Sequence, residues 1–206
     1  MKKAILALLV AGICTATSVA SAATPYLRAS IGAGFMANSD YDPSFPLVIV
    51  TPFVADAVTY KSGVSLDGAV GLKIGSFRVE EELSYQSSKV EHAKPMSLTS
   101  LSPITDGASM DMLTYMTNVY YDIAIRNSPV TPYVMFGLGG AHVSFSNASA
   151  SISGDRFASQ YGLGVGIVAT DQFTVDIGCR FVEPLDFDGL ITMQDTKIMA
   201  GVRYGF

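Results

Sequence analysis

The sequence has few cysteines and only one long apolar run, and both shortages reduce the number of possible fold classes. Cys14 and Cys179 are the two cysteines, and Cys14 lies in a segment that we expect to be removed. Cys179 would then stand alone, so no intramolecular disulfide could form even in an oxidising compartment. The mean hydropathy of the chain is nevertheless positive, at +0.36. A helical membrane protein would need further apolar runs of about 20 residues, and water-soluble domains are rarely so apolar.

Basic residues are also scarce. Lys2 and Lys3 belong to the segment that we expect to be removed, and without them 11 basic residues stand against 18 acidic ones. Nucleic-acid binding by charge attraction depends on a basic surface. The net charge near −7 therefore excludes a nucleic-acid partner of that kind.

Residues 1–22 have the composition of a cleaved signal peptide. Lys2 and Lys3 give the positive start, residues 4–14 the apolar run, and residues 20–22 a small-residue cleavage site. The strongly apolar part has about 11 residues, fewer than the roughly 20 that span a bilayer, which disfavours a membrane anchor helix. Ile13 disfavours lipid attachment at Cys14, because a small residue should precede a lipid-modified cysteine. We expect a mature chain that begins at Ala23 and forms one domain over residues 23–206.

The mature chain alternates apolar and polar residues in eight segments. Successive side chains of a β-strand point to opposite faces, so this alternation indicates strands with one apolar face. The segments are 26–35, 64–74, 77–86, 113–123, 133–139, 160–167, 173–181 and 197–206. A closed barrel with an apolar outer face and a polar lumen pairs every backbone group, and it explains both the alternation and the hydropathy. The sequence therefore predicts an eight-stranded antiparallel up-and-down transmembrane β-barrel.

The connections between these segments alternate in length. The second, fourth and sixth segments are followed by short turns at 75–76, 127–129 and 170–172. Long loops are expected at about 36–62, 87–111, 143–156 and 182–195. Short turns of outer-membrane barrels face the periplasm and long loops face outside, so we expect both termini in the periplasm. An apolar stretch at 45–60 in the first loop indicates either strands that extend above the membrane or an adhesive surface.

A soluble ligand-binding barrel is the main alternative fold, because it too can have eight alternating strands. Its apolar face would point inward and its charges outward. In this sequence the charges share a face with the glycines, as expected where small residues line a narrow lumen. Aromatic residues gather near both ends of the apolar face: Phe35, Tyr85, Tyr115 and Phe157 toward the outside, and Phe77, Tyr121, Phe173 and Phe206 toward the periplasm. Two such girdles are typical of a barrel in a membrane.

Eleven charged residues fall on the inward face of the predicted strands. Six are basic and five are acidic: Arg28, Lys73, Arg78, Arg180, Lys197 and Arg203, with Asp67, Glu80, Glu82, Asp122 and Asp176. Eight strands leave an interior just wide enough for side chains. We therefore expect ion pairs that plug the lumen, in preference to an ion pathway, a proton relay or acid-base catalysis. The other 5 basic and 13 acidic residues make the loops, turns and outer face acidic.

Four motifs resemble the small outer-membrane barrels of the opacity-protein and OmpA transmembrane-domain type. They are Phe77-Arg78-Val79-Glu80-Glu81-Glu82-Leu83, Asn118-Val119-Tyr120-Tyr121-Asp122, Thr131-Pro132-Tyr133-Val134 and Arg203-Tyr204-Gly205-Phe206. The resemblance covers essentially the whole mature chain. It implies a barrel surrounded by outer-membrane lipid and lipopolysaccharide, and it specifies the activity poorly. Proteins of the OmpA type often continue into a domain that binds peptidoglycan, and we expect no cell-wall anchoring by that route here.

The last predicted strand ends in an aromatic residue with apolar residues at alternate positions before it. These residues are Ile198, Ala200, Val202, Tyr204 and Phe206. The pattern resembles the signal by which the barrel-assembly machinery recognises its substrates. An ordinary amphipathic strand is the alternative, and the carboxyl group directly after Phe206 favours the assembly signal.

Glu81 departs from the alternation, because its position would face lipid. A carboxylate there costs less than the roughly 2 to 4 kcal/mol of a midplane Arg or Lys. The departure could mark a subunit contact, a local bulge or a protonated carboxyl group.

His142 and Ser144 raise one enzymatic hypothesis. A His and a Ser two positions apart on one strand resemble outer-membrane lipid A deacylases, in which a general base activates a hydroxyl group that faces lipid. Asp155 could orient the histidine from across the loop. Serine-rich loops also produce such pairs by chance.

We expect a non-enzymatic outer-membrane protein without cofactor or metal, acting as a surface antigen, an adhesin or an envelope-integrity protein. A host or matrix molecule is the candidate ligand of the loops. A narrow ion or small-solute channel is the alternative, and a lipid A-modifying enzyme is the less favoured third hypothesis.

Overall fold

The computed structural model describes residues 23–36, 39–41, 54–60, 62–93, 109–146, 151–185 and 194–206. Over these ranges the chain forms ten β-strands, and no helix there has the length and apolar character needed to span a membrane. The predicted signal peptide at 1–22 and most of the apolar loop stretch, residues 45–53, lie outside the described residues.

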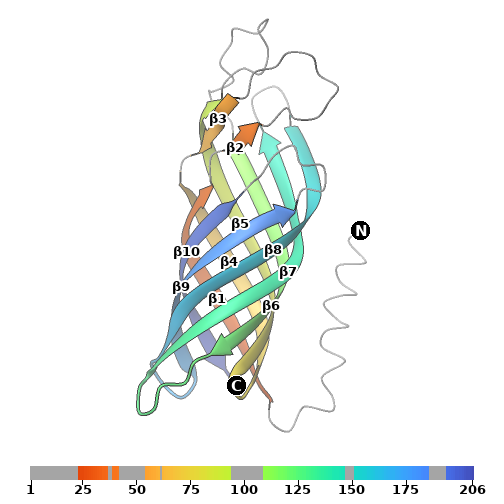
Figure 1. Ribbon diagram of the computed structural model, residues 1–206. Helices are drawn as coiled ribbons and strands as arrows, with labels where there is room; N and C mark the ends of the chain where they lie inside the picture. The colour runs from red at the N-terminus through yellow and green to blue at the C-terminus, as the bar shows by residue number, and fades with distance from the viewer. Residues whose placement is uncertain are drawn as a thin grey trace, which may run out of the picture.

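Eight strands close into an antiparallel barrel, which confirms the predicted fold (Figure 1). In order around the barrel they are β1 (Ala23–Met36), β4 (Gly63–Ile74), β5 (Phe77–Ala93), β6 (Ser109–Asp122), β7 (Val130–Ser146), β8 (Ser151–Val168), β9 (Phe173–Leu185) and β10 (Asp195–Gly205). The first and last strands complete the ring, with Tyr26 opposite Gly205 and Met36 opposite Asp195. Closure leaves no unpaired sheet edge in the membrane, which is the condition for a strand-built span.

The two ends of the barrel differ. The end that we call the turn end contains the connections at 75–76, 123–129 and 169–172 together with Ala23 and Phe206. Gly75 has a φ of 59° and Asn127 a φ of 58°, values that suit glycine and asparagine in tight turns. The opposite end, which we call the loop end, carries β2 (Ser39–Tyr41) and β3 (Val54–Tyr60). These two strands extend the sheet beside the upper part of β5, where Val58 pairs with Ala93 (Figure 1).

The strands at the loop end are longer than the alternation predicts. The predicted loops at 87–111, 143–156 and 182–195 are wrong in extent, because β5 continues to Ala93, β6 begins at Ser109, and β7, β8, β9 and β10 also enter these ranges. The outward residues there are polar, for example Ser87, Lys89 and Asp111. Apolar and polar residues stop alternating where the strands leave the apolar band, but the backbone pairing continues.

The alternation of faces is regular through the barrel wall. Large apolar side chains lie exposed on the outer face, while most charged side chains lie buried in the lumen. Small inward residues make room for large ones. A side chain at Gly71 would meet the ring of Tyr26, and one at Gly164 would meet the hydroxyl group of Tyr133. The lumen is therefore filled by side chains that cross it, as eight strands require.

Candidate functional site

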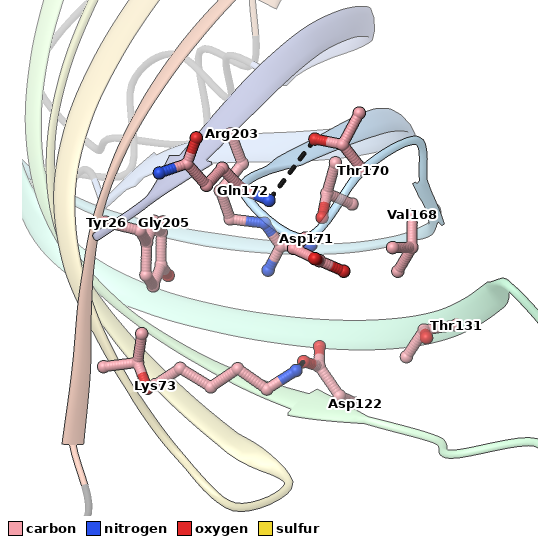
Figure 2. Close-up of a pocket in the computed structure, with 12 residues that line it drawn as sticks. Tyr26, Lys73, Asp122, Thr131, Val168, Thr170, Asp171, Gln172, Arg203 and Gly205 are labelled. Atoms are coloured by element: carbon pink, nitrogen blue, oxygen red, sulfur yellow. Dashed lines mark hydrogen bonds and ion pairs between the residues drawn. The ribbon is translucent and has the colours of Figure 1, made fainter.

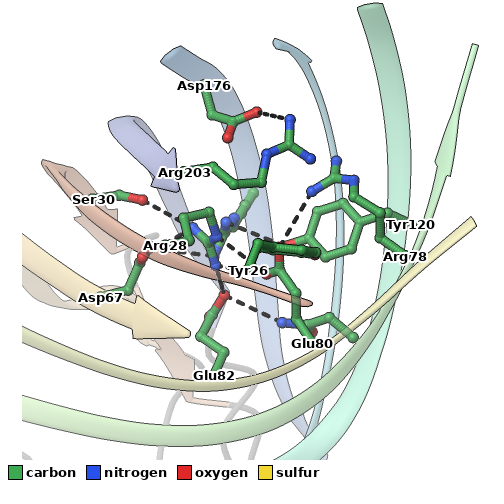
Figure 3. A network of polar contacts seen from close by, with 12 residues as sticks. Tyr26, Arg28, Ser30, Asp67, Arg78, Glu80, Glu82, Tyr120, Asp176 and Arg203 are labelled. Atoms are coloured by element: carbon green, nitrogen blue, oxygen red, sulfur yellow. Dashed lines mark hydrogen bonds and ion pairs between the residues drawn. The ribbon is translucent and has the colours of Figure 1, made fainter. Parts of the chain in front are cut away.

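Arg28 on β1 is the centre of a buried polar network in the middle of the lumen (Figure 3). Its guanidinium group contacts three carboxylates, with Nη1 2.9 Å from Asp67 Oδ1 and Nη2 2.9 Å from Glu80 Oε2 and 2.6 Å from Glu82 Oε2. Nη1 also donates a hydrogen bond of 2.9 Å to Ser30 Oγ. These acids come from β4 and β5, so one arginine joins three neighbouring strands.

Arg180 reaches the same acids from the opposite wall. It lies on β9, which is four strands away from β5 around the barrel. Its Nη1 forms ion pairs with Glu82 Oε2 and, at 3.3 Å, with Asp67 Oδ2. Its Nη2 donates to the hydroxyl group of Tyr120 at 3.3 Å. Asp67 and Glu82 are thus held between two arginines, and the contacts bridge the full cross-section of the lumen.

Neutral side chains fill the remaining hydrogen-bonding positions of the central acids. Tyr26 donates its hydroxyl hydrogen to Glu80 Oε1 at 2.7 Å. Asn118 donates to Glu82 Oε2 at 3.2 Å, and Gln160 donates to Glu82 Oε1 at 3.4 Å and to Asn118. Glu80 and Glu82 are therefore bound on both oxygens by arginine or neutral donors, an arrangement that suits a fixed structural plug better than a proton-transfer pair.

A second group of ion pairs lies toward the turn end. Arg78 Nε is 2.9 Å from Asp122 Oδ1, and its Nη1 is 3.2 Å from Glu80 Oε1, which links this group to the central network. The guanidinium of Arg78 also lies over the ring of Tyr120, 4.1 Å from the ring centroid. Lys73 Nζ is 3.2 Å from Asp122 Oδ2, with 45% of the lysine side chain exposed.

The mouth of the barrel at the turn end contains a pocket of about 230 Å³ (Figure 2). Lys73, Asp122 and Arg203 are its charged inner lining, and Asp171 and Gln172 border it from the β8–β9 turn. Arg203 forms a separate ion pair with Asp176, with 3.2 Å between Nη2 and Oδ1. Asp122 therefore both lines this pocket and pairs with Arg78 in the second group of ion pairs.

Toward the loop end the lumen changes character. Lys197 Nζ lies 3.8 Å from Asp195 Oδ2 and donates to Ser84 Oγ at 3.1 Å. Gln86 donates to Asp195 at 2.8 Å. Beside these polar residues, an apolar cluster fills the interior: Met36, Met110, Met112, Met116, Ala141, Ala158 and Val182. The lumen is therefore less polar at the loop end, where methionines occupy inward positions of β6.

The structure places all eleven predicted lumen residues on the inward face, and each takes part in an ion pair. Ten are buried and Lys73 is half-exposed. Eight of them are linked into one set of contacts: Arg28, Asp67, Lys73, Arg78, Glu80, Glu82, Asp122 and Arg180. The sequence prediction did not include Asp195, which was assigned to a loop. Counting back two positions from Lys197 would have found it.

The outer face of β10 carries the residues of the predicted assembly signal. Ile198, Val202 and Phe206 are exposed on the outer face. Tyr204 packs between two aromatic rings at the turn end, 5.1 Å from the centroid of Phe173 and 5.1 Å from that of Phe206. Ala200 lies between Ile198 and Val202 on the same face and pairs with Ile31 and Ile177. The role of these residues in assembly stays a prediction.

His142, Ser144 and Asp155 lie on the outer face near the loop end. His142 and Asp155 are cross-strand partners on β7 and β8, and His142 Nδ1 is 2.7 Å from Asp155 Oδ1. Ser144 is two residues further along β7 and therefore on the same face as His142. The row of outward residues directly below them includes Tyr115 and Phe157, both aromatic and exposed.

Glu81 lies on the outer face in the middle of β5. The pairing of β5 with β4 and with β6 is continuous through this position, with Glu81 opposite Val70 and opposite Thr117. A local bulge is therefore excluded. Thr117 Oγ1 lies 2.9 Å from Glu81 Oε1 and 3.1 Å from Oε2 and donates its hydrogen to the carboxylate.

Comparison with known proteins identifies relatives among outer-membrane barrels. The family model of the outer membrane protein beta-barrel domain matches residues 5–206. Outer membrane protein PagN of Salmonella typhimurium is 33% identical over 120 residues, which are 46% of this chain and 50% of PagN. Major surface antigen 4 of Anaplasma marginale is 34% identical over 99 residues, which are 40% of this chain and 35% of that protein. The matched stretches thus span half or less of these two relatives.

Solved structures show the same fold. Neisserial surface protein A superposes with a TM-score of 0.62 at 17% identity, covering 89% of this chain and 99% of that structure. The outer membrane protein OprG from Pseudomonas aeruginosa gives a TM-score of 0.57 at 15% identity, covering 90% of this chain and 96% of that structure. At these identities the likeness concerns the barrel architecture alone.

Proposed function

Since the chain belongs to the outer membrane protein beta-barrel domain family, we propose that it is a non-enzymatic surface protein whose plugged barrel serves as a scaffold for ligand binding at the loop end. The observation that carries this proposal is the network that joins Arg28 and Arg180 across the lumen through Asp67 and Glu82. A lumen filled in this way leaves binding to the surfaces outside it.

The orientation follows from the unequal ends of the barrel. Outer-membrane barrels have short turns in the periplasm and longer connections outside. The turn end and both termini of the barrel then face the periplasm, and the extended β5, β7 and β8 rise above the outer leaflet. The polar outward residues of these extensions, such as Lys89, Ser144 and Asp155, suit contact with lipopolysaccharide head groups and water.

The proposed ligand is a molecule of another cell or of a host matrix, bound at the loop end. Two observations support this class. One relative is named a major surface antigen. The charged residues outside the lumen are mainly acidic, even with Asp195 assigned to the interior, which favours ligands with basic patches.

Binding of whole cells tests the proposal. Cells that produce the wild-type protein should bind immobilised matrix proteins more than cells without it, and binding should fall as salt concentration rises. Replacing residues 42–53 and 94–108 by short Gly-Ser segments should abolish the gain, with equal amounts of folded barrel in the outer membrane. Equal binding by the wild-type and loop-replaced proteins would show that the replaced segments do not bind the ligand.

The contact between His142 and Asp155 favours a second candidate, hydrolysis of an acyl ester of outer-leaflet lipid. Asp155 holds Nδ1 of the histidine, which leaves Nε2 to accept the proton of the Ser144 hydroxyl as that oxygen attacks an ester carbonyl. The histidine would then pass the proton to the leaving alkoxide as the ester bond breaks, and water would release the fatty acid from the acyl-serine. The exposed aromatic residues directly below support a position of this group at the depth of the lipid head groups.

Mass spectrometry of lipid A from cells with and without the protein tests the second candidate. The second candidate is supported if lipid A lacks an acyl chain in cells with the wild-type protein and keeps that chain in cells with Ser144→Ala or His142→Ala. Val143→Ala, whose side chain lies on the inward face, is the matched control and should behave as wild type. Identical lipid A in all strains would show that the protein does not hydrolyse lipid A.

A further inference from the structure

The pocket at the turn end is lined by charged side chains of both signs (Figure 2). Lys73 and Arg203 reach it from β4 and β10, the two strands that flank β1. Asp122 lines it at the end of β6, and Asp171 lines it from the β8–β9 turn. Its volume of about 230 Å³ equals that of roughly eight water molecules in the liquid. The pocket therefore has room for a small polar group.

The two cationic residues of the pocket have hydrogen-bond donors to spare. The Lys73 ammonium has three N–H donors, its side chain is 45% exposed, and it forms an ion pair with Asp122. Arg203 has five N–H donors, of which its ion pair with Asp176 occupies Nη2. Phosphate oxygens suit both residues, because the arginine fork binds two oxygens at once and a lysine binds as a point charge. A phosphate group between the two side chains would use donors from two strands.

The acidic residues of the pocket require a donor on the same ligand. Asp122 Oδ1 accepts a hydrogen bond of 2.9 Å from Arg78 Nε. Its Oδ2 is buried and accepts no hydrogen bond from the described residues, although Lys73 Nζ lies 3.2 Å away. A buried acceptor without a donor costs free energy, and the half-exposed lysine can leave this oxygen for a phosphate. Asp171 adds an exposed carboxylate. Both carboxylates would repel a bare phosphate and attract an ammonium group.

We propose that this pocket binds a phosphoethanolamine group, in which two carbons join a phosphodiester to an ammonium group. The phosphate lies between Lys73 and Arg203, and the ammonium group lies at Asp122 and Asp171. The two charges of this ligand cancel, as do the two cations and two carboxylates of the lining, so binding leaves no unpaired charge in the mouth of the barrel. In the orientation proposed above the pocket faces the periplasm. The group can reach it there as a phospholipid head group or as a soluble glycerophosphodiester.

Calorimetric titration of the protein, purified from outer membranes in a nonionic detergent, tests the site. Glycerophosphoethanolamine, the soluble head group, should bind saturably with one molecule per barrel. Glycerophosphoglycerol has the same phosphodiester but no ammonium group, and ethanolamine has no phosphate. Each should bind about tenfold or more weakly, because each loses one set of charge-assisted hydrogen bonds.

Two variants separate the two halves of the site. Lys73→Gln should weaken binding of both phosphodiesters by about fivefold or more, whereas Asp171→Asn should weaken only glycerophosphoethanolamine, because its carboxylate contacts the ammonium group. Arg126→Gln, in the exposed β6–β7 turn at the same end but outside the pocket lining, is the control and should bind as wild type. Each barrel is checked for its heat-dependent gel shift. Asp171 lies in an exposed turn, so Asp171→Asn keeps the comparison valid if Lys73→Gln does not assemble.

The same titration in bilayer discs identifies the source of the ligand. An apparent affinity for the soluble head group that is lower in discs of phosphatidylethanolamine than in discs of phosphatidylglycerol would mean that the lipid head group occupies the pocket. Equal affinities in the two discs would mean that the ligand is a soluble glycerophosphodiester. Three results would overturn the site: no saturable binding by the wild-type protein, equal affinities for the two phosphodiesters, or unchanged binding of glycerophosphoethanolamine in both pocket variants.

Discussion

Arginine occupies the centre of the lumen because its guanidinium group has five N–H donors fixed in one plane. Arg28 uses them on Asp67, Glu80 and Glu82 at once, and Arg180 on Asp67 and Glu82 from the other wall. The ammonium group of a lysine is a compact charge without that planar fork. In agreement, the two lumen lysines lie away from the centre, Lys73 at the turn end and Lys197 toward the loop end.

The alternation predicted which charged residues face inward, but it could not predict their partners. Asp176 lies four residues from Arg180 on the same inward face, and the alternation alone allows either Asp176 or Glu82 as a partner of Arg180. Arg180 contacts Glu82 and Asp67, and Asp176 pairs with Arg203. The partner is set by the stagger of strands around the closed barrel, which is a property of all eight strands and leaves no mark in one segment.

Replacing Arg180 should destabilise the barrel. Arg180→Ala removes one of the two cations that hold Asp67 and Glu82, and breaking a buried pair typically costs about 3 to 5 kcal/mol. We expect the temperature at which the detergent-gel band shifts to fall clearly below that of wild type. Arg126→Ala, in the exposed β6–β7 turn, is the control and should shift at the wild-type temperature. Equal shift temperatures for the two variants would contradict a stabilising role of the network.

At the scale of the strand, the sequence predicted the eight membrane-spanning segments and missed their upper ends. Apolar and polar residues alternate where a strand has lipid on one side and the polar lumen on the other. The lipid side ends at the aromatic row nearer the loop end. Beyond it β7 has His142 and Ser144 outward, and β8 has Ser153 and Asp155, so the outward face is also polar although the strands remain paired. The pairing there depends on cross-strand contacts such as that of His142 with Asp155.

Deletion of Phe206 should impair insertion of the barrel. The residue ends the apolar face of β10 and packs against Tyr204, so its loss alters the proposed assembly signal and one aromatic contact at the turn end. We expect several-fold less protein in the outer membrane and more degradation in the periplasm, measured by fractionation and surface protease accessibility.

The control for this deletion is Asp171→Asn in the β8–β9 turn, at the same end of the barrel but outside the signal. Its outer-membrane level should equal that of wild type. Equal levels for the Phe206 deletion and wild type would show that the terminal motif is an ordinary amphipathic strand.

At the scale of the whole molecule, ring closure makes the barrel resist detergent. Each of the eight barrel strands pairs on both sides, so the unfolding of the ring has no free edge from which to start. The unboiled protein should run as a compact species on detergent gels and move to a different position after boiling. A single band that is unaffected by heating, in protein taken from outer membranes, would argue against a closed barrel.

Ion conductance measurements test whether the lumen of the barrel is closed or lets ions pass. The central network spans the lumen from β4 and β5 to β9, so wild-type protein in planar bilayers should give no steady open current. The triple variant Arg28→Ser, Glu82→Ser and Arg180→Ser replaces long side chains of the network by short ones, which should open a water-filled path and produce a measurable ohmic conductance. Leu83→Ala, on the lipid-facing side of the same strand as Glu82, should remain closed. A steady conductance of the wild-type protein at the level of the triple variant would favour the narrow channel over the scaffold.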